Sequence, residues 1–464
     1  MSNRVMFCLG LSFVFLAGLI TLTQLKAKQP EPKKEAASPP TQVETPGSKA
    51  ETPAAKAETP ATPVQPKPLS DNVKKGVAYL VNQQHHDGGW GQGGGWRQAT
   101  KDGGRVEGDK VTDPSDLGST CIAVLALIRA GHTPTVGEHA KKVAQAVDFM
   151  LARVEKAGKD SLYLTDVRDT QLQSKIGPYV DTFLAQLVMA ELKGKMPDEK
   201  GEKRLLAAFD KTMTKIAKHQ KADGNFDKNE AWASTLSMAL CSKGINRAAQ
   251  NGLMVPDRVL AADQKANTAG LDRTKGTFTA PAAGPAGVAA SSDAGVAVYR
   301  QSGQTAGLQE AVNTLKKDEA KNREILNSPK AAPKAKEEAK RELDRLGEAE
   351  AAQKVAVDGL IRRLDDKQFI QGFGSNGGEE FLSYMNISET LVVKGGKDWV
   401  AWDKGICDAL TNAQDKDGGW SGQHCITGRT FCTATALLTM LADRAPIPLV
   451  KKDDKKDEKK DEKK

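Results

Sequence analysis

The strongest constraint on the fold is a repeated unit between residues 70 and 446. In each copy an amphipathic helix ends in Gln, a turn with Asp-Gly and an aromatic residue follows, and a helix of small residues comes next. One such unit cannot bury its apolar face alone, so neighbouring units must stack to form a shared core. The repeat therefore predicts an all-α domain built from helical hairpins.

Three copies of the turn are clear. The first lies in KGVAYLVNQQHHDGGWG, the second in KTMTKIAKHQKADGNF and the third in GICDALTNAQDKDGGW. Their matching positions are Gln84, Gly88 and Trp90; Gln220, Gly224 and Phe226; and Gln414, Gly418 and Trp420. The turn reverses the chain, the Gln amide can satisfy backbone groups left open at helix ends, and the aromatic residue caps the apolar interior. We expect these residues to be structural rather than to contact a ligand.

The first copy resembles the QW motif of the squalene cyclase and prenyltransferase repeat family, whose toroids are terpenoid cyclase-like. It matches every specified position of that motif, namely Lys75, Gly76, Tyr79, Leu80, Gln84, Gly88 and Trp90. The resemblance covers residues 70–446 and implies an α/α toroid, a two-layered ring of helical hairpins. Weaker units at 140–195, around SSDAGVAVYRQSG and from Phe381 through NISETLVV bring the total to about six hairpins. Helices of small and aliphatic residues would form the inner wall.

Both ends of the chain differ from the repeat region in composition. Residues 1–25 contain the uncharged stretch Val5–Leu25, which can cross a bilayer, whereas the apolar part of a cleaved signal peptide is about 7–15 residues long. We expect a retained signal anchor, a transmembrane helix that exports the toroid to the periplasm or cell exterior; the alternative is secretion after cleavage. Residues 26–69 predict a disordered Pro/Ala/Lys/Glu linker, and residues 447–464 a charged, disordered tail.

An insertion interrupts the repeat at residues 304–367, where Ala, Glu, Lys and Arg predominate. These are strong helix formers, and Asn327-Ser328-Pro329 supplies a break between two limbs. The sequence predicts a helical hairpin that projects from the ring. It is either a decoration that packs on itself or an arm that docks a protein partner.

Charge and cysteine content exclude two classes of protein. The formal net charge is +8, but no cluster of Arg and Lys is interleaved with aromatic residues, so nucleic-acid binding is not expected. Six cysteines are too few for a disulfide scaffold in a chain of 464 residues.

Classical cyclase chemistry is not expected either. The resemblance implies an acid in a D-x-D-D motif, but the chain offers only DPSD at Asp113–Asp116. Cyclases also need aromatic faces to stabilise carbocations, and this chain has only 12 Phe, 6 Trp and 5 Tyr. The sequence leaves open whether the protein is an enzyme.

No metal site or cofactor is predicted. The protein prenyltransferase branch of the family holds zinc with Asp, Cys and His, the first two in a D-x-C arrangement, and no D-x-C occurs here. The nearest group is Asp403, Cys407, His424 and Cys425, whose spacings match no standard zinc signature.

Four carboxylates begin the helices expected to form the inner wall: Asp116, Asp181, Glu230 and Asp293. In a toroid these residues could converge on one rim of the central cavity. There they could bind cations, act on a sugar, or cap their helices.

Three functions follow from this interpretation. The first is a membrane-tethered, exported toroid that binds an apolar or extended ligand, such as a lipid, an isoprenoid or a glycan, in its central cavity. The second is an enzyme, either a divergent terpenoid cyclase or prenyltransferase or a carbohydrate-active toroid. The third is an envelope scaffold that holds protein partners.

Overall fold

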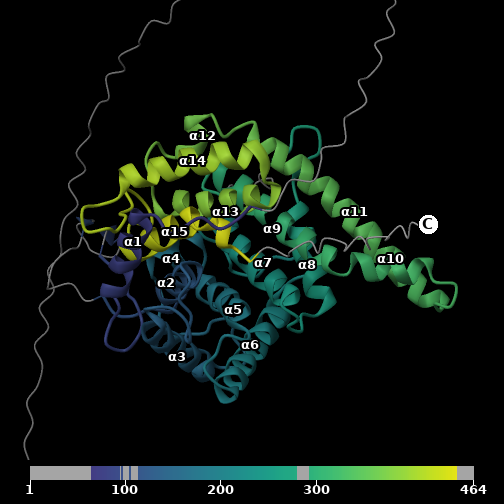
Figure 1. The fold of residues 1–464 in the computed structure, drawn as a ribbon, viewed down its shortest axis with the longest axis horizontal. Coiled ribbons are helices and arrows are strands. Elements are labelled where there is room, and N and C mark those ends of the chain that lie inside the picture. The colour runs from purple at the N-terminus through teal and green to yellow at the C-terminus, as the bar shows by residue number, and fades with distance from the viewer. Residues whose placement is uncertain (1–63, 95, 98–103, 106–112, 280–291, 447–464) are drawn as a thin grey trace, which may run out of the picture. The chain divides into compact units, whose positions relative to one another are not determined.

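The computed structural model describes residues 64–94, 96–97, 104–105, 113–279 and 292–446 (Figure 1). The chain divides into two units, Met1–Thr59 and Pro60–Lys464, and every described residue belongs to the second unit. The expected membrane anchor, the charged tail and all of the linker before Val64 therefore lie outside the described residues.

The prediction of an all-α fold is confirmed, since the described residues form fifteen α-helices and only four short strands. The helices are α1 (Asp71–Asn82), α2 (Leu117–Arg129), α3 (Ala140–Lys156), α4 (Gln171–Ile176), α5 (Val180–Leu192), α6 (Glu199–His219), α7 (Ser234–Gln250), α8 (Asp257–Thr268), α9 (Ala297–Lys317), α10 (Glu319–Asn327), α11 (Pro333–Ile361), α12 (Lys367–Gln371), α13 (Gly378–Lys394), α14 (Gly396–Ala413) and α15 (Arg429–Met440). Within the described ranges, none of them is long and apolar enough to cross a membrane.

The strands form two antiparallel pairs. Strand β1 (Trp96–Arg97) pairs with β2 (Gly104–Arg105), and β3 (Leu271–Asp272) pairs with β4 (Thr277–Phe278).

Six helices are buried on nearly all sides: α2, α5, α7, α9, α13 and α15. A helix can be buried all round only if it presents small or apolar side chains in every direction, as the sequences LGSTCIAVLALIR and VDTFLAQLVMAEL do. Helix α2 packs against α5, α5 against α7, α7 against α9, α9 against α13, α13 against α15, and α15 against α2. The order of contacts thus returns to the helix from which it started.

A second set of helices is amphipathic and packs on the first. Helix α3, for example, buries Val143, Val147, Met150 and Val154 on one face. Helix α1 packs on α15, α3 on α2, α6 on α5, α8 on α9, α11 on α9, and α14 on α13. Helix α8 also packs on α7, so each of the six buried helices has at least one amphipathic helix packed against it.

Charged side chains meet between the buried helices toward their carboxyl ends. The group consists of Arg129 on α2, Glu191 on α5, Lys243 and Arg247 on α7, Glu310 on α9, and Glu389 on α13. Arg247 lies 2.9 Å from Glu310 and 2.7 Å from Glu389, and it also pairs with Glu191. Arg129 lies 2.5 Å from Glu191, and Lys243 pairs with Glu389. Five of the six buried helices are joined by this ionic network.

The repeat turns bond one unit to another. The Gln84 side-chain amide donates hydrogen bonds to the carbonyl oxygens of Gly88, at 2.8 Å, and Lys142, at 2.9 Å. In the last unit, Gln414 donates to the carbonyl oxygens of Gly418, at 2.8 Å, and Asn72, at 2.9 Å. Because Asn72 lies in the first turn of α1, this bond joins the end of the repeat region to its beginning.

The aromatic residue of each turn is buried. Trp90 and Trp420 donate their indole N–H groups to the carbonyl oxygens of Leu80 and Leu410, each at 2.8 Å. Phe226 occupies the equivalent position in the middle copy and packs on Phe183, with ring centroids 5.1 Å apart.

The hairpin expected at 304–367 begins later in the structure. Residues 304–317 continue α9, whose side chains are buried through Asn313. The last part of α11 also packs on α9, where Ala352 and Ala356 contact Leu308, so the projecting part consists of α10 and the beginning of α11 (Figure 1). Helix α10 has no buried residue.

We expect replacement of Gly88 by alanine to destabilise the fold, whereas the same replacement at Gly347 should not. Gly88 has φ +89°, and a Cβ there would lie 2.7 Å from the carbonyl oxygen of Gln145. Gly88→Ala should lower the free energy of unfolding by about 1–3 kcal/mol from backbone strain, and more from the clash. Gly347→Ala is the matched control, because it lies within α11 with open space around it and should stabilise by up to about 1 kcal/mol. Equal effects of the two variants in urea unfolding would contradict this account.

Candidate functional site

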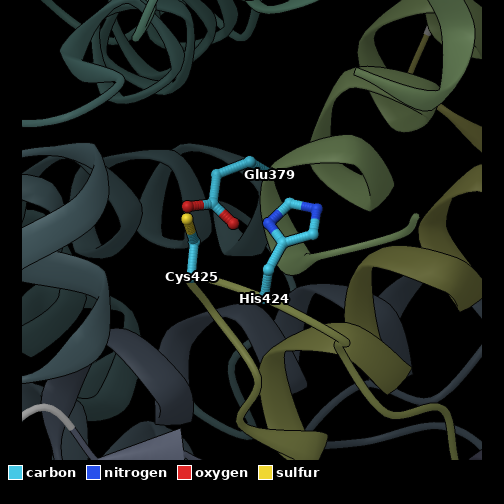
Figure 2. A group of neighbouring side chains, drawn as sticks. All are labelled: Glu379, His424 and Cys425. Carbon is cyan, nitrogen blue, oxygen red and sulfur yellow. The ribbon is translucent and has the colours of Figure 1, made fainter. Parts of the chain in front are cut away.

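A compact group of three side chains lies where α13 begins and the loop before α15 passes it. Ligand-type atoms of Glu379, His424 and Cys425 all lie within 4.8 Å of one another. Figure 2 shows the three side chains pointing toward each other. Glu379 is fully buried, whereas His424 and Cys425 are half-buried. This group is the densest set of potential metal ligands in the part of the chain that the structure describes.

Two glycines allow the two segments to approach. The amide of Gly378 donates to the carbonyl oxygen of Ile426 at 2.8 Å. A Cβ on Gly377 would lie 2.7 Å from the carbonyl oxygen of His424 and 2.8 Å from its ring. Larger residues at Gly377 or Gly378 would push away the loop that contains His424. The two glycines therefore allow the Glu379 carboxylate to lie against the His424 ring.

Contacts on the side of the ring that faces away from Glu379 and Cys425 fix the orientation of His424. Its Nε2 lies 2.9 Å from the carbonyl oxygen of Ser375 and 3.2 Å from Glu380 Oε2. Glu380 is held in turn by the amide of Gly377, at 2.7 Å, and by the hydroxyl of Tyr299. These acceptors require a proton on Nε2, and Nδ1, which faces the group, has no hydrogen-bond partner.

The electrostatics of the site favour a shared proton or a bound cation. Burial, and after it the charge of Glu380, raises the pKa of Glu379 to about 7. Burial lowers the pKa of His424, but the neighbouring Cys425, Glu380 and Ser375 carbonyl outweigh burial and raise that pKa to about 11, so without a metal the ring is a cation. Cys425 has φ +51°, a conformation that non-glycine residues seldom adopt outside functional or strained sites.

Two exposed aromatic rings flank the group. Phe373, 49% exposed, meets the His424 ring edge-on at 5.3 Å, and Trp232, 47% exposed, lies 6.2 Å from Phe373. The Lys175 ammonium lies over the Trp232 ring, 5.4 Å from its centroid. The two rings form a contiguous exposed apolar patch with polar groups beside it, and patches of this kind are common on surfaces that bind ligands.

Of the four predicted rim carboxylates, the structure brings two together. Asp116 caps α2, accepting a hydrogen bond from the Ser119 amide at 2.7 Å, and Asp181 lies in the first turn of α5. Burial and, next, the charge of Asp181 raise the pKa of Asp116 to about 7; burial raises that of Asp181 to about 6. Glu230 is exposed, and Asp293 instead pairs with Arg300 at 2.7 Å.

The zinc candidates considered from sequence are divided by the fold. Asp403 and Cys407 lie on α14, where Asp403 pairs with Lys67 at 2.5 Å. His424 and Cys425 instead meet Glu379, a residue that the sequence did not predict at this site. Glu379 is distant in sequence and belongs to no spacing motif, and its only signal was the Gly-Gly pair before it.

Comparison with known proteins adds no relative, since no protein-family model and no curated protein matches this chain.

The buried Asp116 should make stability depend on pH. In the folded chain Asp116 keeps its proton up to about pH 7, whereas its ordinary pKa is 3.8. Its contribution to stability is complete below pH 3.8 and is lost as the pH rises through about 7. Asn can cap the helix but cannot ionise, so Asp116→Asn should gain stability relative to the natural chain, on the order of 4 kcal/mol between pH 4 and 8.

Asp198→Asn is the matched control, because Asp198 caps α6 in the same way but is exposed. Its unfolding should follow the pH dependence of the natural chain. Urea unfolding at several pH values measures both variants, and parallel pH profiles for Asp116→Asn and Asp198→Asn would refute the assignment.

Proposed function

We propose that this chain is an exported α/α toroid of the squalene cyclase and prenyltransferase repeat type, tethered by residues 1–25, that binds an apolar or extended ligand. The ligand site is the end of the ring at which Trp232, Phe373 and His424 lie. The exposed aromatic pair beside the Glu379–His424–Cys425 group carries this proposal.

The helix contacts support a ring. Six buried helices follow one another in a circuit that returns to α2, and amphipathic helices pack outside them. The bond from Gln414 to Asn72 links the last repeat to the first, as ring closure requires. These contacts are what a toroid of six hairpins would make.

The position of the ligand follows from where charge is buried. Toward the carboxyl ends of the buried helices, the ionic network joins side chains from five of them and occupies the space between. A pocket of about 300 Å³ beside it is lined by Glu191, Lys193, Gly194, Lys195, Asn251 and Pro446. Charged walls suit an apolar ligand poorly. The amino ends of the helices, with their exposed rings, suit it better.

The ring faces restrict the ligand chemistry. Trp and Phe present flat, apolar faces to a partner, and such faces favour another flat group, an isoprenoid chain or the apolar face of a sugar. The Lys175 ammonium beside Trp232 would favour an anionic group at one end of that ligand.

An enzyme remains the second candidate, and the paired Asp116 and Asp181 favour it. Two buried carboxyl groups with raised pKa values are the kind of groups that donate protons in catalysis. A lipid or glycan that is converted by the natural chain but not by Asp116→Asn would support this candidate.

The binding proposal predicts a ligand that depends on the aromatic pair. The full chain, purified from its own membrane, should carry a lipid or glycan visible by native mass spectrometry and extraction. Trp232→Ala/Phe373→Ala should lose most of it, at least tenfold, because both stacking faces are removed. Met254→Ala is the control, since Met254 is 84% exposed elsewhere on the surface.

Two results would contradict the proposal. One is the same ligand retained by the double variant as by Met254→Ala. The other is a chain that carries no lipid or glycan but retains a protein partner, which would favour the scaffold interpretation.

A further inference from the structure

We propose that Glu379, His424 and Cys425 bind one zinc ion through Glu379 Oε1, His424 Nδ1 and Cys425 Sγ. This inference goes beyond the proposed ligand-binding function and does not depend on it. It assigns a cofactor to the group shown in Figure 2.

Two buried polar atoms in this group have no hydrogen-bond partner among the residues that the structure describes. Glu379 is fully buried, and while its Oε2 accepts a hydrogen bond from the Ile426 amide at 3.1 Å, Oε1 has none. His424 Nδ1 is likewise buried and unpaired. Buried polar atoms are almost always paired, and an unpaired one calls for an unseen partner such as a water or an ion. Here the two atoms belong to side chains whose ligand-type atoms converge.

The hydrogen bonds of His424 Nε2 and of Glu380 are those expected around a metal-bound histidine. A metal-bound histidine almost always donates its other ring N–H to a carboxylate or a backbone carbonyl, which fixes its tautomer. His424 Nε2 lies against both kinds of acceptor, Ser375 and Glu380, so it keeps its proton and Nδ1 is the nitrogen that gives up a proton when the ion binds. Glu380 is itself held by Gly377 and Tyr299, so its role is to orient the ring rather than to bind the ion.

The donor atoms select the metal. Thiolate, imidazole and carboxylate together suit zinc, whereas calcium and magnesium prefer oxygen ligands throughout. In a tetrahedral zinc site the ligand atoms lie roughly 3.5 Å from one another, as the usual bond lengths of about 2.0–2.3 Å require. The three atoms already lie within 4.8 Å, so small side-chain rotations complete the site. Three protein ligands leave a fourth position for water or a bound molecule.

Zinc content of the full chain tests the proposal. The chain is purified in detergent without chelators, and elemental analysis should find about one zinc per chain. Glu379→Gln, His424→Gln and Cys425→Ser should each lower the zinc content at least tenfold. Glu379→Gln keeps an oxygen for the Ile426 amide, so it removes little besides the charge of the ligand. Cys407→Ser and His219→Gln are matched controls outside the group and should keep the metal.

Cobalt gives a readout on the natural chain, which does not depend on how well the variants fold. Co²⁺ added to the zinc-free natural chain should give intense visible bands of four-coordinate cobalt and a thiolate charge-transfer band. The charge-transfer band should vanish in Cys425→Ser and persist in Cys407→Ser. Zinc should also raise the melting temperature of the natural chain but not that of Cys425→Ser.

Either of two findings would overturn the assignment. One is a natural chain that binds neither zinc nor cobalt, which would leave His424 as a cation hydrogen-bonded between Glu379 and Glu380. The other is metal binding that survives equally in all three ligand variants. Loss of metal does not require loss of the lipid or glycan that Trp232 and Phe373 hold, so the two proposals can fail separately.

Discussion

The structure depends most on the ionic network that joins α2, α5, α7, α9 and α13 between the buried helices. Although burial raises the pKa of Glu389, the charges of Arg247, Lys243 and Arg129 lower it well below its usual range. The network contains three cations and three carboxylates, so no net charge is buried. Removing one partner from such a group costs far more than an exposed ion pair contributes, because the remaining charges are left unpaired away from water. This constraint fixes the order and rotation of five helices at once.

The repeat turns add a second constraint. In the first and last copies, a Gln amide bonds its own turn and a carbonyl of another unit, and a Trp indole bonds the preceding helix. The turns thus fix the spacing of the hairpins, while the network fixes the carboxyl ends of the buried helices. Glu379 and Glu389 lie on the same helix, ten residues or roughly 15 Å apart. A rigid α13 therefore carries the proposed zinc ligand on one end and a member of the network near the other.

The sequence predicted the features that are local and missed those that are not. The Gln and aromatic positions repeat within short segments, so the hairpins and the all-α class could be recognised. The boundary of the projecting arm could not, because residues 304–313 look polar and exposed in composition but are buried against neighbouring helices such as α7 and α11. The charged residues of the network are spread from Arg129 to Glu389 and form no motif. Glu379 meets His424 only because Gly377 and Gly378 let two distant segments touch. Whether the buried helices close the ring that the repeat resembles stays a proposal.

The most direct test of this account is the free energy of urea unfolding of Glu389→Gln, compared with that of Glu319→Gln. Glu389 is buried among three cations, whereas Glu319 pairs with Arg323 on the partly exposed surface of α10. We expect Glu389→Gln to lose about 3–5 kcal/mol and Glu319→Gln to lose less than about 1 kcal/mol. Losses of similar, small size in both variants would show that the network does not hold the buried helices together.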